Sequence, residues 1–381
     1  MNVYKKHNSF LELRHRSKDI EWRVRERIQR LSLQLEPPDL HSKQVSIWRK
    51  AVDDLLTQAP DDGRPRFRLS PNVIEEINSF PDAVVPRYLV HRYRYEMYPQ
   101  LHIIDDYPPY LQIEPTSRCN YRCVFCYETD PTFTKRSSGF MGSMSIDLFK
   151  RVVDEAQGNV EFISLASRGE PLLCPDIEAM LAYTPGKFLN LKLNTNASLL
   201  DERGCHAILQ SGVKTVVFSA DAAREPLYSQ LRVGGKLDEV LTNIERFQRL
   251  RETRYPNRNI ITRVSGVKFS DEQDLDSMEQ LWGGLVDQVA FVKYNPWENT
   301  YMQPKNDLIA PCSDLWRRMF VWWDGKVNPC DVDYKSTLSV GNLLKSSLSK
   351  LWVGAEYSGL RETHLSSNRS GIEPCSRCTV V

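Results

Sequence analysis

Residues 114–127 read EPTSRCNYRCVFCY, and this stretch decides how the rest of the chain is interpreted. It places Cys119, Cys123 and Cys126 within eight residues, directly after a β-rich run at residues 110–114. If that run is the first strand of a parallel barrel, the cysteine loop lies at its C-terminal end, where such folds place their chemistry. We therefore predict that the three cysteines form one ligand group at the functional end of a sheet.

Short β-rich runs alternate with helical segments downstream of this loop. Six strands are predicted at residues 110–114, 161–166, 189–194, 215–220, 260–265 and 288–293, with helices at 145–157, 176–183, 201–210, 237–251 and 271–282. Such alternation implies parallel strands joined by right-handed crossovers. Six units are too few for a closed eight-unit barrel. The sequence thus predicts an α/β fold built on a partial (β/α)6 barrel.

Two further units flank the predicted barrel, which we place at residues 110–310. Residues 1–109 are predicted to be a helical extension, because apolar residues from Leu13 to Leu35 recur at spacings of three, four and seven. Residues 311–381 are predicted to be a small C-terminal domain, with a hairpin at 320–329 and one helix at 347–362.

Composition excludes several classes of function. Of 381 residues, 50 are Lys or Arg and 49 are Asp or Glu, so no overall charge favours a nucleic-acid partner. No apolar run is long enough to span a membrane, and the first ten residues lack the apolar core of a secretory signal. We therefore expect a cytoplasmic protein. Its nine cysteines then indicate metal binding or catalysis rather than a disulfide framework.

The first cysteine group is better suited to iron–sulfur chemistry than to zinc. Three thiolates on one loop can cover one face of a [4Fe–4S] cluster, which usually takes four thiolates, and so leave one iron open. Structural zinc sites instead pair closely spaced cysteines with two distant partners and close the fourth position. A lone three-cysteine loop fits that pattern poorly.

The spacing C-x3-C-x2-C, with Phe125 before the last cysteine, resembles the signature of the radical S-adenosylmethionine (SAM) superfamily. The resemblance implies a reducible [4Fe–4S] cluster on Cys119, Cys123 and Cys126, with SAM bound at the open iron. It implies that one electron splits SAM into methionine and a 5′-deoxyadenosyl radical, which removes a hydrogen atom from the substrate. It also implies an external electron donor, such as flavodoxin or ferredoxin.

Polar residues at later strand ends extend the resemblance. It assigns contacts with the SAM site to Phe125, Gly169, Glu170, Asn196, Ser219 and Arg232. Glu170, in a segment similar to the family's G-G-E-P, would accept hydrogen bonds from the SAM ammonium, and Arg232 would pair with the SAM carboxylate. Ser219 and Asp221 form an S-x-D pattern that suits ribose hydroxyls. Arg168 replaces the first glycine of G-G-E-P, so it either narrows the pocket or reaches an anionic substrate group.

The second cysteine group comprises Cys312, Cys330, Cys375 and Cys378. Two cysteine pairs from separated segments can together supply the four ligands of one metal site. At this site zinc is an open alternative to an iron–sulfur cluster. The spacing resembles the auxiliary-cluster domains of radical SAM enzymes, of the SPASM and shorter twitch types. The resemblance implies one auxiliary [4Fe–4S] cluster with four cysteine ligands, since the further cysteines of a two-cluster domain are missing.

An electron-accepting cluster beside a radical generator indicates net oxidation. Both cluster spacings resemble those of 2-deoxy-scyllo-inosamine dehydrogenase, which oxidises an aminocyclitol. We therefore predict dehydrogenation, or another radical modification, of a small-molecule or glycan-type substrate that is sugar- or cyclitol-like. Lys293, at the end of the sixth strand, is a candidate base.

Three alternatives stay open. An epimerase would return a hydrogen atom from a thiol, for which Cys174 is the candidate. A peptide maturase acting on a ribosomal peptide often carries a leader-binding β-sheet, whereas residues 1–109 are predicted to be helical. The third alternative is a zinc-stabilised interaction module without enzymatic activity.

Overall fold

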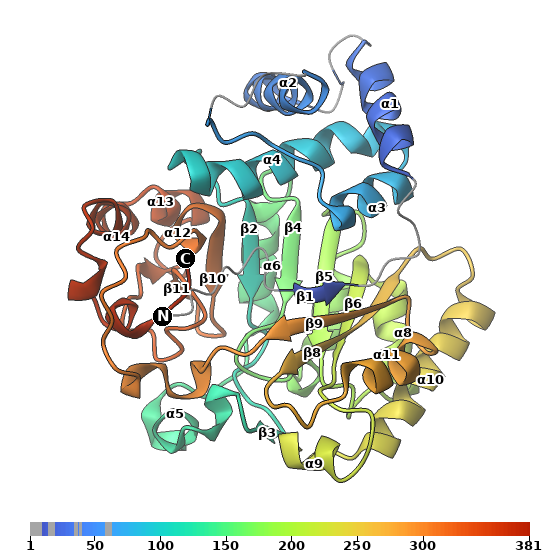
Figure 1. The fold of residues 1–381 in the computed structure, drawn as a ribbon. Coiled ribbons are helices and arrows are strands. Elements are labelled where there is room, and N and C mark those ends of the chain that lie inside the picture. The colour runs from blue at the N-terminus through green and yellow to red at the C-terminus, as the bar shows by residue number, and fades with distance from the viewer. Residues whose placement is uncertain (1–9, 14–19, 34–36, 38–39, 58–62) are drawn as a thin grey trace.

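The computed structural model describes residues 10–13, 20–33, 37, 40–57 and 63–381, and its centre is a parallel sheet (Figure 1). The six predicted strands are present and parallel: β2 (Tyr110–Ile113), β4 (Phe162–Leu165), β5 (Asn190–Thr195), β6 (Val213–Ser219), β8 (Ile261–Lys268) and β9 (Gln288–Lys293). They stand in the sheet in chain order. The predicted partial barrel is therefore confirmed.

Helices join successive strands and cover the outer face of this sheet. They are α6 (Ile146–Ala156), α7 (Ile177–Ala182), α8 (Glu202–Gln210), α9 (Leu227–Leu231), α10 (Leu237–Arg254) and α11 (Leu275–Gly283). The start of three of them follows from a capping side chain: Ser145, Asp201 and Asp274 each accept a backbone N–H of the first turn. Their apolar faces and the strands share one large core.

Both edges of the parallel sheet carry added strands, giving ten strands in all. On one edge, β1 (Phe10–Leu13) pairs antiparallel with β9, so the prediction that residues 1–109 are helical is wrong for this segment. An open sheet edge presents unpaired backbone groups that a short extended segment can satisfy. Leu13 belongs to this strand rather than to the predicted helical stripe, and Leu35 lies outside the described residues.

On the other edge, the C-terminal segment continues the sheet. The predicted hairpin is present as β10 (Arg318–Val321) and β11 (Lys326–Asn328), followed by β12 (Gly341–Asn342). Strand β10 pairs in parallel with β2, the strand that leads into the cysteine loop. This pairing brings the second cysteine group to the same side of the molecule as the first.

Four helices cover the N-terminal ends of the strands (Figure 1). They are α1 (Glu21–Ser32), α2 (Ser42–Leu56), α3 (Pro71–Ser79) and α4 (Val85–Leu101). They form a second apolar core that includes Tyr110 and Phe162 from the strand starts, and the His91 ring stacks on Phe162 at 3.8 Å. Helix α3 begins at Pro71, since proline is well accommodated in a first helical turn.

The remaining elements are short. They are β3 (Arg122–Cys123), α5 (Pro131–Thr134), β7 (Arg232–Val233), α12 (Asp314–Arg317), α13 (Leu348–Trp352) and α14 (Ala355–Leu365). The last two replace the single helix predicted at residues 347–362, since the chain leaves helical geometry at Gly354, where the backbone is extended.

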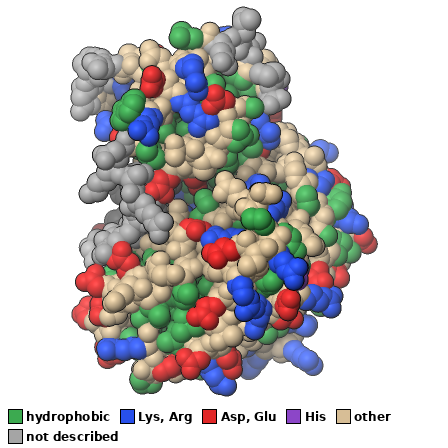
Figure 2. Space-filling view, turned by 90° about the vertical axis from the view of Figure 1, so that its right-hand side faces the viewer, with side chains coloured by type: hydrophobic (Ala, Val, Ile, Leu, Met, Phe, Trp, Pro, Cys, Tyr) green, Lys and Arg blue, Asp and Glu red, His purple; other side chains and the backbone are tan. Residues whose placement is uncertain are grey.

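Among the described residues, no helix is both long and apolar enough to cross a membrane. The surface in Figure 2 shows acidic and basic side chains interspersed, as the near-zero net charge leads one to expect. The functional site must therefore be sought in local features at the strand ends.

Candidate functional site

The three cysteines of the first group line one cavity of about 250 Å³ at the C-terminal ends of the strands. Two local features fold the loop around it. Cys123 pairs with Arg232 in the short β3–β7 ladder, and the Cys126 N–H donates to the Cys123 carbonyl at 2.9 Å. Cys119, Cys123 and Cys126 thus surround a common space, as predicted.

The three thiols need a positively charged partner to become thiolates, because they are buried. Burial raises the pKa of Cys119 to about 12 and also raises the pKa values of Cys123 and Cys126. Thiolates are needed to bind metal, and bound metal ions supply the charge that keeps such thiols deprotonated. Among the described residues, no three metal-binding side chains converge on a point that a single ion could occupy. A cubane cluster instead takes its thiolates on separate irons.

The loop after β4 packs directly against the cysteine loop. A Cβ atom at Gly169 would lie 2.4 Å from the carbonyl oxygens of Arg118 and Thr116, so only glycine fits there. The next residue, Glu170, donates its N–H to the Arg118 carbonyl at 2.9 Å. This contact explains the glycine in the motif: it brings the Glu170 side chain beside the cysteines.

Glu170 is buried and lines the cavity. Its carboxylate accepts the N–H groups of Asn196 and Leu172, at 2.7 and 3.1 Å, and the hydroxyl of Thr195 at 2.7 Å. Burial raises its pKa, although these hydrogen bonds and the charge of Arg232 act in the opposite direction. A carboxylate can accept about four hydrogen bonds, which leaves one position for a cationic donor such as an ammonium.

The other predicted SAM contacts also converge here. Phe125, Asn196, Ser219 and Arg232 all line the cavity. Arg232 is buried, with its Nε 2.5 Å from Asp221 and its Nη1 3.8 Å from the Cys123 sulfur. Asp221 is occupied by this ion pair and by the Val267 N–H, and it does not line the cavity, unlike Ser219.

Several residues of the cavity wall carry buried polar atoms that lack partners. Within the described part of the chain, Asn194 Oδ1 and Ser167 Oγ are buried without a hydrogen bond. Buried polar groups are nearly always satisfied in native proteins, so such orphans indicate a bound polar molecule. The thiols, the carboxylate and these atoms together fit an iron–sulfur cluster with SAM.

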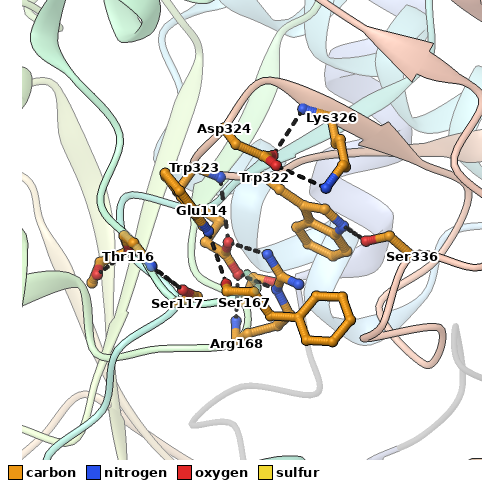
Figure 3. A network of polar contacts seen from close by, with 12 residues as sticks. Glu114, Thr116, Ser117, Ser167, Arg168, Trp322, Trp323, Asp324, Lys326 and Ser336 are labelled. Carbon is orange, nitrogen blue, oxygen red and sulfur yellow. Dashed lines mark hydrogen bonds and ion pairs between the residues drawn. The ribbon is translucent and has the colours of Figure 1, made fainter. Parts of the chain in front are cut away.

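Arg168, the departure from the G-G-E-P pattern, is held by a fully buried ion pair (Figure 3). Its Nε and Nη2 donate to the two oxygens of Glu114, each at 2.6 Å, and its Nη1 donates to the Tyr334 carbonyl at 2.8 Å. The guanidinium also lies 4.2 Å from the Trp322 ring centre. Glu114 and the Tyr334 carbonyl thus take up the hydrogen bonds of the guanidinium, so Arg168 narrows the pocket and does not reach a substrate. Its bond to Tyr334 also joins the barrel to the C-terminal segment.

Breaking the Glu114–Arg168 ion pair should destabilise the folded protein. We expect Glu114→Ala to lower the free energy of unfolding by about 3–5 kcal/mol, because Arg168 then stays buried without its counter-charge. Urea titration measures the change. As control, Asp106→Ala removes one partner of the exposed Lys43–Asp106 pair and should leave the free energy of unfolding nearly unchanged. Equal losses in the two variants would contradict the role given to Glu114.

The second cysteine group also comes together. Burial raises the pKa of Cys330, and Asp333 and the cysteines 375, 312 and 378 raise it further by their proximity. Burial lowers the pKa of His364 to about 4, and its ring Nδ1 accepts the Cys312 N–H at 3.2 Å. The buried Arg369 donates to the Cys378 carbonyl at 2.9 Å. These contacts fix the two separated segments around one site.

Each cysteine group has members in an apolar cluster, and the two clusters share Trp297. Trp297 lines the first cavity and packs in one apolar cluster with Cys312, Cys330 and Cys378. It also belongs to a second cluster, in which Tyr127 stacks on Tyr334 with ring centres 5.0 Å apart. Trp297 therefore links the apolar surroundings of the first cysteine group to those of the second.

The structure places the two catalytic candidates, Cys174 and Lys293, in different surroundings. Cys174 is buried in the main core, 3.8 Å from the Met144 carbonyl, and does not line the cavity. Lys293 does line the cavity, where its side chain is exposed. Sequence reasoning missed Asn295 and Trp297, although their position just after the sixth strand was a usable signal.

Comparison with known proteins agrees with this site. Residues 113–280 match the radical SAM superfamily, and residues 312–379 match SPASM, an iron–sulfur cluster-binding domain. A GTP 3′,8-cyclase of Clostridium botulinum (strain Okra) is 26% identical over 216 residues, 54% of this chain and 64% of that protein. The tungsten-containing aldehyde ferredoxin oxidoreductase cofactor-modifying protein of Pyrococcus furiosus is 23% identical over 304 residues, 66% of this chain and 83% of that protein.

The chain spans less than two thirds of the GTP 3′,8-cyclases that it matches. Among solved structures, Streptococcus suis SuiB bound to S-adenosylmethionine shares the fold, with a TM-score of 0.52, 16% identity and 76% coverage of both chains. The matched iron–sulfur domain favours iron over zinc at the second cysteine group. Residues 113–280 are therefore a radical SAM domain and residues 312–379 an iron–sulfur SPASM domain, and the two domains together imply SAM and two [4Fe–4S] clusters as cofactors.

Proposed function

We propose that this enzyme oxidises a sugar- or cyclitol-like substrate at a carbinol carbon. SAM and its cluster supply a 5′-deoxyadenosyl radical when bound, and that radical takes the carbon-bound hydrogen atom. The substrate then loses its hydroxyl proton and one electron, leaving a carbonyl group and a net loss of two hydrogens. Cys312, Cys330, Cys375 and Cys378 would hold the auxiliary cluster, which would supply the acceptor for that electron.

The observation that carries this proposal is the position of Trp297. It forms part of the cavity wall and packs in the same apolar cluster as three of the four auxiliary cysteines. A substrate radical in the cavity would thus be separated from an electron acceptor by packed aromatic groups rather than by solvent. An electron-accepting site beside the cavity suits an oxidation, in which the substrate radical must give up an electron.

The cavity wall supports a hydroxyl-rich substrate. Besides the SAM contacts it includes Asn295 and Tyr294, both just after β9; the Tyr294 hydroxyl donates to Glu298 at 2.5 Å and keeps its oxygen as an acceptor. Hydroxyl and amide groups bind polyols through several directional hydrogen bonds. The epimerase alternative lacks its predicted thiol at this place, because Cys174 lies in the core.

Anaerobic incubation with SAM, a reductant and candidate extracts tests the proposal. We expect 5′-deoxyadenosine above the extract-free level, together with one component that becomes two hydrogens lighter in the mass spectrum. A component that is consumed and returned with unchanged mass would contradict oxidation.

Glu170 gives a separate prediction for the SAM site. Glu170→Ala should weaken SAM binding by about tenfold or more, since a hydrogen bond to a charged group contributes about 1.5–3 kcal/mol. Equilibrium dialysis without oxygen measures the affinity, and iron content should stay at the parent level. Glu252→Ala, on the exposed face of α10, is the control. A Glu170→Ala variant that binds SAM as tightly as the parent would exclude Glu170 from the site.

A further inference from the structure

A second cavity, of about 330 Å³, adjoins the first. The two share Lys293, Tyr294 and Asn295, the residues just after β9. At its far side the second cavity is lined by Cys378, one of the auxiliary ligands. The second cavity is thus bordered by residues of the first cavity and by one cysteine of the second group, and it remains as adjoining space when SAM and its cluster occupy the first.

This second cavity is cationic. Lys293, Lys305 and Arg377 line it, and its described wall contains no Asp or Glu. Glu373, outside the wall, pairs with Lys305 at 3.3 Å and with Arg377 at 2.8 Å. The ammonium of Lys293 has no hydrogen bond or ion pair in the described part of the chain. The three cationic side chains of the wall thus have one carboxylate, that of Glu373, as a counter-charge. Lys293 is therefore available to bind an anionic ligand.

A hydrogen-bond donor also points to a ligand at the junction of the two cavities. Among the described residues, nothing accepts a hydrogen bond from the buried Nδ2 of Asn295, which lines both cavities. A buried amide N–H without an acceptor is costly, so a ligand with acceptor oxygens would relieve it. The lysine beside it favours a ligand that carries negative charge.

We propose that the second cavity binds an anionic group of the substrate, a phosphate ester or a carboxylate. Its cations hold that group while the carbinol carbon extends past Asn295 into the first cavity. Lys293 then acts as a binding cation rather than as the base considered from the sequence. The inference rests on the proposed function in one respect, that the ligand of this cavity is the substrate to be oxidised.

Anion binding can be measured without turnover. The probe is inorganic pyrophosphate, titrated calorimetrically at fixed ionic strength into enzyme that carries both clusters and saturating SAM, so that the first cavity is filled. We expect saturable binding that weakens about tenfold in the Lys293→Gln/Lys305→Gln double variant, as lost charge-assisted hydrogen bonds predict. The matched control is Lys345→Gln/Lys350→Gln, which removes the same charge at two exposed lysines elsewhere. No saturable binding by the parent, or equal affinities of the two double variants, would overturn the proposal.

Two treatments of an active extract distinguish the source of the charge. Loss of turnover after alkaline phosphatase indicates a phosphate ester, and loss after methylation of carboxyl groups indicates a carboxylate. Turnover that survives both treatments would overturn the proposal. Failure of the oxidation hypothesis is seen separately, because it changes the product mass and not the pyrophosphate affinity.

Discussion

Cys126→Ala should abolish the formation of 5′-deoxyadenosine, and Cys119→Ala and Cys123→Ala should do the same. The three sulfurs line one cavity and are the only protein ligands expected for the SAM-binding cluster. Two thiolates cannot hold a four-iron cubane that already leaves one iron to a non-protein ligand. Chromatographic assay of 5′-deoxyadenosine under dithionite measures the loss, and iron content should fall by about half, since one of two clusters is lost.

The control is Cys205→Ala. Cys205 is a buried thiol on α8 that belongs to the core and lies in neither cavity wall. This variant should keep both its iron content and its SAM cleavage. Full SAM cleavage in all three variants of the first cysteine group would contradict the assignment of the cluster.

The second large effect should separate SAM cleavage from product formation. We expect Cys312→Ala/Cys330→Ala to keep forming 5′-deoxyadenosine while product falls to background, because the substrate radical then has no electron acceptor. These two cysteines lie in the apolar cluster that contains Trp297, behind the wall of the cavity. Mass spectrometry of both compounds from one reaction gives the ratio.

This result depends on an intact C-terminal domain. Circular dichroism and the retained SAM affinity of the double variant show whether the domain still folds. Product formed at the parental ratio to 5′-deoxyadenosine, in a variant shown to lack the auxiliary cluster, would contradict the role given to the second site.

Much of the fold could be predicted, because strand and helix periods alternate clearly from residue 110 to residue 293. The features that could not be predicted are strand pairings, which do not depend on the local spacing of apolar residues. The four residues of β1 are too few to show a strand period, and their partner β9 lies about 280 residues away. The parallel pairing of β10 with β2 likewise joins segments about 200 residues apart, which no local pattern reveals.

The candidate site was predictable where a motif fixes several residues at once. The cysteine spacing and the G-E-P segment located the cluster and Glu170, and the structure brings both to one cavity. The partners of Arg168 and the place of Trp297 were not predictable, because each depends on contact between the barrel and the C-terminal segment. Arg168 could be recognised only as a departure from the family pattern.

The product mass in heavy water tests the central claim most directly. Oxidation removes one carbon-bound and one hydroxyl hydrogen, so the isolated product should be two hydrogens lighter than the substrate and carry no deuterium on carbon. One 5′-deoxyadenosine should form per product. A product of unchanged composition, with deuterium bound at one carbon, would contradict the oxidation and indicate hydrogen return from an exchangeable donor.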